Sequence, residues 1–442
     1  MIKKSFLRLS VVWGMMFLVA GNSFGQDRDT LRVMAYNLLN YGEVTSYCTT
    51  TNNPIASKDE YFKTIAKHVD PDILVVNEMG ASAVYSERIL AKVLNTDGVS
   101  KYQKTGLQSN GFSNIVNAVF FNKNKFKLVE QQKVTKNLNN TDIVRAIDIC
   151  TFYYKDPLLD DVKDTTYIHV VAAHLKAGNS SSDQTDRALA SEAVMAYLEA
   201  NYETGNFILA GDLNLKGSSE NGYKNLTSQA PSDYRFYDPI DSEGNWNNSS
   251  AYKNIHTQST RSSSTNGGCF SGGGMDDRFD VILMSESMLA DTGQAIYVDG
   301  SYDAVGQDGN HFNQAINSGS NSSVPSSVLS ALYEMSDHLP VIADIAIEKL
   351  EQEPDTTPEG LIEIMLESKV YMSNGQLIIK GASQARAHFE IFNMVGGKVS
   401  EGPITRTREK ISMLEQAPGV YIIRLTSASG ASLTQKVILT RD

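Results

Sequence analysis

Two short polar motifs hold the residue types best suited to chemistry. They are Gly211-Asp212-Leu213-Asn214 and Ser336-Asp337-His338-Leu339-Pro340, and each borders an apolar run. The run 207–210 leads into the first motif and the run 341–347 leads out of the second, so both lie where buried strands are expected to reach the surface. Carboxylate, amide and imidazole groups at strand ends are typical of the active site of an α/β enzyme.

Two earlier strand-like runs also end on residues that can bind a metal. Asn37 follows the run 31–36, and Glu78 follows the run 72–77. Carboxylate and amide oxygens suit hard cations such as Mg²⁺. Hydrolysis of a phosphate ester needs charge neutralisation at the phosphate, a deprotonated water and a stabilised leaving oxygen. The four strand ends together carry groups for all three tasks.

The elements that must position these residues alternate along the chain as a layered α/β protein requires. Apolar positions spaced as on one face of a helix occur at 61–69 and 189–198. Further strands are expected at 118–121, 146–152, 167–173 and 279–284. Periodicity alone predicts either an α/β or an α+β fold.

The ordered set of motifs is similar to the endonuclease/exonuclease/phosphatase superfamily, which includes pancreatic-type deoxyribonucleases, abasic-site endonucleases, bacterial sphingomyelinases and inositol phosphatases. The resemblance covers about residues 31–347. It rests on Tyr36-Asn37, Asn77-Glu78, Ala173-His174-Leu175, Gly211-Asp212-Leu213-Asn214, Arg278-Phe279-Asp280 and Ser336-Asp337-His338. It implies an α/β chain in the form of an α+β four-layered αββα sandwich, deoxyribonuclease-like, with the site in loops at one rim. Many members have Gln where this chain has Asn77.

Residue chemistry and the resemblance together indicate which residues bind the metal ion and which position the attacking water. Glu78 and Asp337, with Asn37 beside them, are expected to hold Mg²⁺, with Mn²⁺ or Ca²⁺ as alternatives. Asp212 and Asn214 are two residues apart on an extended segment, so both can face one side and position the attacking water or a second ion. A lone Asp-X-Asn is more often a turn, and a lone Glu at a strand end is more often a solvated carboxylate.

The acid and base roles fall on a second set of residues. His338 is expected to be the general base, with Asp280 holding its imidazole in the reactive tautomer. Asp276 and Asp277 compete with Asp280 for that role. His174 is then free to hydrogen-bond the phosphate. An unperturbed imidazole base predicts that activity falls below about pH 6.5.

Arg145 matches a phosphate-contacting arginine of the deoxyribonuclease-like branch. Taken singly, Arg145 would more often be a surface ion-pair member, and His174 a structural histidine. The joint occurrence of the motifs in family order favours an enzyme, a metal-dependent phosphoesterase or nuclease. The non-enzyme alternative is a surface binding module on an inactive scaffold.

The N-terminus has the features of a signal peptide at 1–25. Lys3, Lys4 and Arg8 precede a short apolar stretch at 9–20, and small residues follow it. The stretch is too short to span a bilayer comfortably, so we expect no stable membrane insertion. The formal charge of the 442-residue chain is −12, and loss of the three basic residues makes it more acidic. This excludes the basic stripe of a sequence-reading DNA-binding protein.

The three cysteines leave at least one unpaired. Cys150 lies in a strand-like run and is interpreted as a buried small hydrophobe. Cys48 and Cys269 lie in polar, loop-like segments and could pair in an oxidising compartment.

The catalytic domain is expected at 27–347, a charged, proline-bearing linker at 348–360, and an all-β sandwich domain at 361–442. The last segment resembles the C-terminal sorting domain of the type IX secretion system, notably at Phe389-Glu390-Ile391-Phe392-Asn393-Met394-Val395-Gly396-Gly397 and Pro418-Gly419-Val420-Tyr421. The usual Asn-Pro near its start is absent. The resemblance implies export through the periplasm by the type IX machinery to the surface or the medium; a small carbohydrate-binding or adhesive sandwich is the alternative.

The sequence favours an extracellular endonuclease with little sequence specificity, with nucleic acid as substrate. A sphingomyelinase-like enzyme is disfavoured because exposed aromatics for a lipid interface are not evident and the segment 155–164 is acidic. An inositol or sugar phosphate phosphatase stays open, as do the number of metal ions and the oligomeric state.

Overall fold

The computed structural model describes residues 28–157, 159, 166–290, 294–349, 368–373, 375–382, 387–406, 408–428 and 430–440. The signal peptide expected at 1–25 and most of the expected linker lie outside these residues.

The first of two central sheets carries the strands that end at Asn37 and Glu78. Its strand order is β11-β13-β1-β2-β4-β3, and β12 also pairs with β13. β1 and β2 are parallel with Asn37 opposite Asn77, whereas β1 and β13 are antiparallel with Ala35 opposite Val341. The strands are β1 (Arg28–Tyr41), β2 (Ile73–Gly80), β3 (Tyr102–Lys104), β4 (Ile115–Asn122), β11 (Ala295–Tyr297), β12 (Asp303–Ala304) and β13 (Val341–Glu348).

The second central sheet carries His174, Asp212 and Asp280. Its strand order is β5-β6-β7-β8-β10-β9. β7 and β8 are parallel with His174 opposite Asp212, and the antiparallel β10 places Asp280 opposite Asp212. The strands are β5 (Phe126–Lys136), β6 (Asp142–Tyr154), β7 (Tyr167–His174), β8 (Asn206–Asp212), β9 (Phe236–Tyr237) and β10 (Asp280–Ser285).

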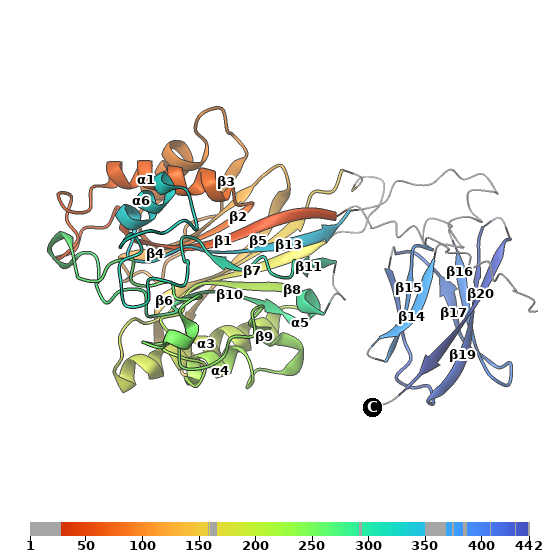
Figure 1. The fold of residues 1–442 in the computed structure, drawn as a ribbon. Helices are drawn as coiled ribbons and strands as arrows, with labels where there is room; N and C mark the ends of the chain where they lie inside the picture. The colour runs from red at the N-terminus through yellow and green to blue at the C-terminus, as the bar shows by residue number, and fades with distance from the viewer. Residues whose placement is uncertain are drawn as a thin grey trace, which may run out of the picture.

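The two sheets pack face to face between helices, as Figure 1 shows, so the four-layered αββα arrangement is confirmed. Side chains alternate along β1: Val33 and Ala35 pack between the sheets, whereas Met34 and Tyr36 pack toward the helices α1 and α6. The helices of five or more residues are α1 (Ile55–Val69), α2 (Ala83–Ile89), η1 (Leu90–Leu94), α3 (Ser181–Asn201), α4 (Asn221–Leu226) and α6 (Ser326–Met335); α5 (Glu286–Leu289) is a single turn.

Local sequence explains the two long helices. The sequence predicts an apolar face of Tyr61, Ile65 and Val69; in α1 Ile65 and Val69 are buried with Phe62, whereas Tyr61 is only partly buried. α3 begins with a capping box, in which the Ser180 side chain accepts from the Asp183 backbone N–H and Asp183 accepts from the Ser180 N–H. These helices cover opposite outer faces of the two sheets in Figure 1.

The C-terminal segment is all-β, as expected. It forms two antiparallel sheets, of order β14-β15-β18 and β17-β16-β19-β20, with a core of its own. The strands are β14 (Lys369–Ser373), β15 (Gln376–Lys380), β16 (His388–Asn393), β17 (Lys398–Pro403), β18 (Arg408–Ser412), β19 (Gly419–Thr426) and β20 (Ser432–Leu439). The boundaries 27–347, 348–360 and 361–442 stay a prediction.

The cysteines behave as the sequence suggests. Cys48 and Cys269 form a disulfide, and Cys150 is free and buried in the core between the sheets. In the part of the chain that the structure describes, no helix is long and apolar enough to span a membrane.

Candidate active site

The strand register brings the expected site residues to one edge of the two sheets. Asn37, Glu78, His174 and Asp212 lie at or near the carboxyl ends of β1, β2, β7 and β8. Asp280 begins β10, and His338 lies shortly before β13. Because β10 and β13 run antiparallel to their neighbours, their amino ends meet the carboxyl ends of the other strands at the same edge.

Irregular backbone changes the direction of two side chains at this edge, those of Glu78 and Asn214. The pairing of β2 is interrupted between Val76 and Met79, and within that interval Glu78 has a φ of 55°. Asn214 has a φ of 51° just beyond β8. Left-handed backbone at non-glycine residues costs free energy and is enriched at functional sites. Regular strand geometry would direct Glu78 elsewhere.

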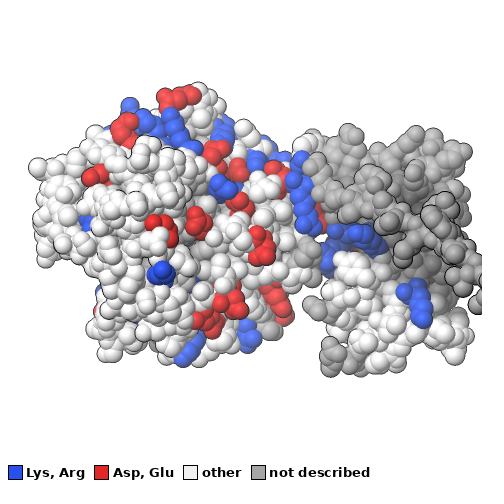
Figure 2. Space-filling model, viewed as in Figure 1, with Lys and Arg blue, Asp and Glu red and all other residues white. Residues whose placement is uncertain are grey.

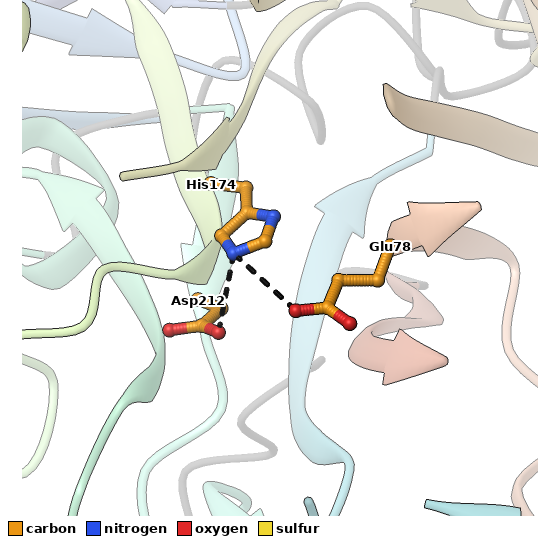
Figure 3. Close-up of side chains that lie close together, drawn as sticks. All are labelled: Glu78, His174 and Asp212. Carbon is orange, nitrogen blue, oxygen red and sulfur yellow. Dashed lines mark ion pairs between the residues drawn. The ribbon is translucent and has the colours of Figure 1, made fainter. Parts of the chain in front are cut away.

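Glu78, His174 and Asp212 form the first cluster (Figure 3). His174 Nε2 lies 3.8 Å from Glu78 Oε1 and 3.5 Å from Asp212 Oδ2. One ligand atom from each residue lies within 4.8 Å of the others. His174 is buried, and neither of its ring nitrogens has a hydrogen-bond partner. Two carboxylates and an unpartnered imidazole at this spacing fit the ligand set of a divalent cation.

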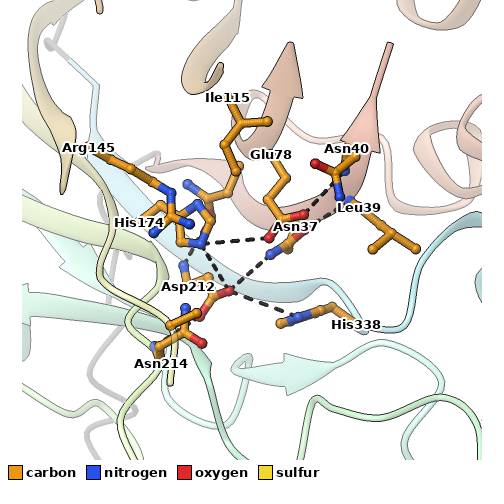
Figure 4. A network of polar contacts seen from close by, with 12 residues as sticks. Asn37, Leu39, Asn40, Glu78, Ile115, Arg145, His174, Asp212, Asn214 and His338 are labelled. Atoms are coloured by element: carbon orange, nitrogen blue, oxygen red, sulfur yellow. Dashed lines mark hydrogen bonds and ion pairs between the residues drawn. The ribbon is translucent and has the colours of Figure 1, made fainter. Parts of the chain in front are cut away.

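Asp212 also belongs to a second cluster, with Asp280 and His338. His338 Nδ1 lies 2.7 Å from Asp280 Oδ2, and His338 Nε2 lies 3.9 Å from Asp212 Oδ2. Figure 4 shows Asp212 between His174 and His338. Asp280 is therefore the carboxylate against His338, whereas Asp277 pairs with Lys216.

Burial and charge set the protonation states. Burial lowers the pKa of His174 well below its usual value, and Arg145 and His338 lower it further, so His174 is neutral. Burial alone would lower the pKa of His338, but Asp280, Asp212 and Asp337 outweigh it and raise that pKa well above its usual value. Burial raises the pKa of Asp212.

Arg145 and Asn214 flank the first cluster. Arg145 donates from Nη1 to the Leu175 carbonyl at 2.8 Å, and Asn214 Nδ2 lies 3.4 Å from the same oxygen. Burial lowers the pKa of Arg145, which Glu78 and Asp212 partly restore. Arg145 is thus beside the site, where the sequence expects it, and its charge faces Glu78 and Asp212.

Asp337 belongs to neither of the two clusters of titratable ligands, although Gln258 Nε2 lies near both Asp337 and His338. Its Oδ2 accepts from the Ser271 N–H at 3.0 Å and lies 3.4 Å from Gln258 Nε2, while its buried Oδ1 has no partner. Among the described residues it is His174, and not Asp337, that clusters with Glu78. The metal role of Asp337 stays a prediction.

Asn37 links the two sheets at the site. Its Nδ2 donates to Asp212 Oδ2 at 2.9 Å, and its Oδ1 accepts from the Leu39 N–H. Leu39 and Asn40 both have positive φ, and the Asn40 N–H donates to Glu78 Oε2 at 3.2 Å. The turn after Asn37 therefore orients both carboxylates of the first cluster.

Buried asparagine side chains, to which the sequence analysis assigned no role, hold Asp212 in place through hydrogen bonds. Asn77 Oδ1 accepts from the Asp212 N–H, and Asn77 Nδ2 donates to Asn117 Oδ1 at 2.8 Å. Gly211 precedes Asp212 with a φ of 139°, and a Cβ there would lie 2.0 Å from the Ala173 carbonyl oxygen. In the sequence, Asn77 and Asn117 could have been singled out because each is an asparagine within an apolar, strand-like run.

Gln258 is a second residue that sequence reasoning missed, and it had no motif to reveal it. Its Nε2 lies 2.8 Å from His338 Nε2. When His338 is neutral and its Nδ1 proton is directed to Asp280, the Nε2 lone pair can accept from this amide. Gln258 thereby favours the tautomer in which Nε2 can act as a base.

Asp148 ends the buried amide chain and makes stability depend on pH. Its Oδ2 accepts from Asn117 Nδ2, and burial raises its pKa to about 8. The unfolded carboxyl, with a pKa of about 3.9, loses its proton at lower pH, so the free energy of unfolding falls as pH rises from about 4 to 8, by up to about 5 kcal/mol.

Asp148→Asn is expected to raise the unfolding temperature at pH 9 and to change it little at pH 4. Thermal unfolding at both values tests this, with exposed Asp142→Asn on the same strand as control; equal shifts at both pH values would contradict it.

Comparison with known proteins identifies the C-terminal segment. Residues 373–440 match the family model of the secretion system C-terminal sorting domain. This confirms the sorting domain expected from the sequence, and it indicates secretion to the cell surface or the medium. No curated protein matches the chain.

Solved structures of the endonuclease/exonuclease/phosphatase superfamily are similar over about 72% of the chain. The human Nocturnin catalytic domain with bound sulfate is 16% identical, covers 72% of this chain and 97% of its own, and has a TM-score of 0.46. A family protein from Bacteroides thetaiotaomicron is 14% identical, covers 73% and 99%, and has a TM-score of 0.44. D. rerio TDP2 complexed with a single-strand DNA product is 12% identical, covers 72% and 98%, and has a TM-score of 0.44. These distant likenesses do not decide the activity.

Proposed function

We propose that residues 27–347 form a secreted, divalent-metal-dependent hydrolase of phosphate esters. The observation that carries the proposal is that Asp212 belongs to two clusters. One cluster is suited to a cation, and in the other the Asp280 carboxylate contacts the His338 imidazole, as in a general base. A phosphate held by a cation bound beside Asp212 would lie between the two clusters. A binding module has no need of this pairing.

The cation side of the site consists of Glu78, with Asn37 and Asp337 as the further ligands expected from the sequence. Asp212 is close enough to Glu78 to share the same ion. A bound divalent cation would supply positive charge to the phosphate oxygens and the leaving oxygen. His174 and Arg145 are proposed to hydrogen-bond the phosphate.

The base side consists of His338 and Asp280. His338 Nε2 would take a proton from the attacking water, and the imidazolium so formed would be stabilised by Asp280 at Nδ1. Asp212 and Asn214 would orient that water. Gln258 must give up its contact with Nε2 before the water can approach.

A nuclease is the finer activity that the sequence favours, and it makes a prediction of its own. Few cations surround the site, so a nuclease here would read little sequence and act through phosphate contacts by His174 and Arg145. Supercoiled plasmid with Mg²⁺ should be nicked and then degraded without site preference. Purified mature protein is tested on DNA, RNA, sphingomyelin and an inositol phosphate, with EDTA as control. EDTA should abolish hydrolysis, and retention of activity in EDTA would contradict the metal-dependent mechanism.

The pH dependence expected from the sequence changes with the structure. The fall below about pH 6.5 assumed an unperturbed imidazole, whereas the pKa of His338 is raised well above its usual value. A base with a raised pKa is protonated at higher pH, so the loss of activity on acidification is expected to begin above pH 6.5. The pH profile of kcat tests this. A profile that stays flat down to pH 6.5 would argue against His338 as the base.

A further inference from the structure

The loops around the site carry almost no exposed charge. We define the rim loops as residues 42–54, 105–114, 259–275 and 305–325. Within them the charged residues are Glu43, Arg261 and Asp308. Arg261 is buried between the rings of Phe270 and Tyr333, and Asp308 pairs with His311. In Figure 2 the left end of the molecule, where the chain emerges from β1 in Figure 1, is mostly white.

Hydrogen bonds attach these loops to the site itself. The loop 259–275 donates from Ser271 N–H to Asp337, and the loop 42–54 follows Asn40, whose N–H contacts Glu78. In the loop 105–114, Asn110 Nδ2 donates to the Ile143 and Val144 carbonyls, directly before Arg145. The loop 305–325 bonds to 259–275 through the Ile316 N–H and the Thr260 carbonyl. The rim loops therefore border the residues of the site.

A group of lysine side chains lies away from the site. A cavity of about 490 Å³ is lined by Lys104, Lys123, Lys127 and Lys155. Its Phe121 pairs with Ile73 at the start of β2, whereas Glu78 lies near the end of that strand. The lysines next to the site, Lys176 and Lys216, are paired with Asp183 and Asp277. A polymer with one negative charge per residue would gain little attraction at the rim.

Tyr47 is the most exposed aromatic side chain of the rim loops, with 64% of its surface accessible. Its loop is held in place, because the adjacent Cys48 is bonded to Cys269 and because Asn52 Nδ2 donates to the carbonyls of Tyr47 and Asn266. The ring lies over Gly268, where a side chain would contact it. A large exposed ring on a fixed loop loses little conformational entropy when a ligand packs against it.

We propose that the substrate joins its phosphate to an uncharged, hydroxyl-rich group, a sugar or oligosaccharide, which binds across the rim loops with one face on Tyr47. This inference rests on the proposed function. The neutral Asn, Ser and Thr side chains of the loops can both donate to and accept from sugar hydroxyls, and an aromatic ring can cover the C–H face of a sugar. In the reaction a water oxygen bonds to phosphorus and the ester P–O bond breaks. The sugar leaves as an alcohol with one proton of the water, and phosphate is released.

Substrate preference tests the proposal. The mature protein with Mg²⁺ or Mn²⁺ is assayed for phosphate release from hexose phosphates and from ethyl phosphate, and for cleavage of single-stranded DNA and RNA. We expect kcat/KM for at least one hexose phosphate to exceed that for ethyl phosphate, and that per phosphodiester for DNA or RNA, at least tenfold. DNA or RNA cleaved faster than every hexose phosphate would overturn the inference and leave the phosphoesterase proposal standing. No hydrolysis of any ester would overturn both.

Substitution of Tyr47 tests whether the sugar packs on its ring. Tyr47→Ala should lower the preference for the hexose phosphate over ethyl phosphate about tenfold, through KM, and Tyr47→Trp should restore it. Tyr167→Ala is the matched control, because Tyr167 is 46% exposed at the start of β7, away from the site. A preference unchanged in Tyr47→Ala, or one lost equally in Tyr167→Ala, would overturn the role of Tyr47.

Discussion

Replacing His338 by alanine is expected to lower kcat for phosphate ester hydrolysis at least about a hundredfold, the usual scale for loss of a general base. The reason is that no other described imidazole contacts both Asp280 and Asp212 as His338 does. Glu78→Gln should have an effect of similar size, because it removes a negative charge from the cation cluster while keeping the shape of the side chain. Initial rates at saturating substrate and Mg²⁺ measure both effects.

Matched controls separate chemistry from folding. His68 is exposed near the end of α1, and Glu60 is exposed on the same helix, so His68→Ala and Glu60→Gln should keep full activity. Circular dichroism and thermal unfolding should show all four variants folded. Near-normal rates in folded His338→Ala protein would rule out the proposed mechanism. For Glu78→Gln, raising Mg²⁺ should restore part of the activity if the lost group binds the ion.

Ending the chain at Ile347 is expected to leave hydrolysis intact and to abolish export in the native host. The physical reason is that the described residues form separate cores: the core between the two central sheets ends with Ile347, and the core of the C-terminal segment begins with Leu377. Few stabilising contacts are expected to cross such a boundary. The matched sorting domain, 373–440, is then absent.

Two measurements test the truncation. The purified shortened protein should unfold cooperatively and keep the kcat and KM of the full chain. In cells, it should accumulate in the periplasm, whereas the full chain reaches the surface or the medium. Loss of folding on truncation would show that the two-domain division is wrong. Normal export would show that the C-terminal segment does not address the protein to the type IX machinery.

The element pattern and the site motifs were largely determined by local sequence. Apolar runs predicted β1, β7 and β8, and the four-residue spacing of Tyr61, Ile65 and Val69 predicted α1, because strand and helix burial each leave a characteristic apolar pattern. The ordered motifs brought Asp212, Asp280 and His338 into one hypothesis before any fold was known. The structure places these three side chains in one cluster.

Contacts between distant segments were decided only by the tertiary structure. Glu78 meets His174 because a bulge in β2 turns its side chain, and the sequence shows no sign of that bulge. Gln258 reaches His338 across 80 positions of chain. The pKa of His338 is raised because Asp280, Asp212 and Asp337 outweigh the lowering effect of burial, so an isolated histidine in the sequence could not reveal the shift. Sequence determined which groups were available for chemistry. The face-to-face packing of the two sheets determined which of them meet, because that choice depends on strand register, burial and charge over the whole domain.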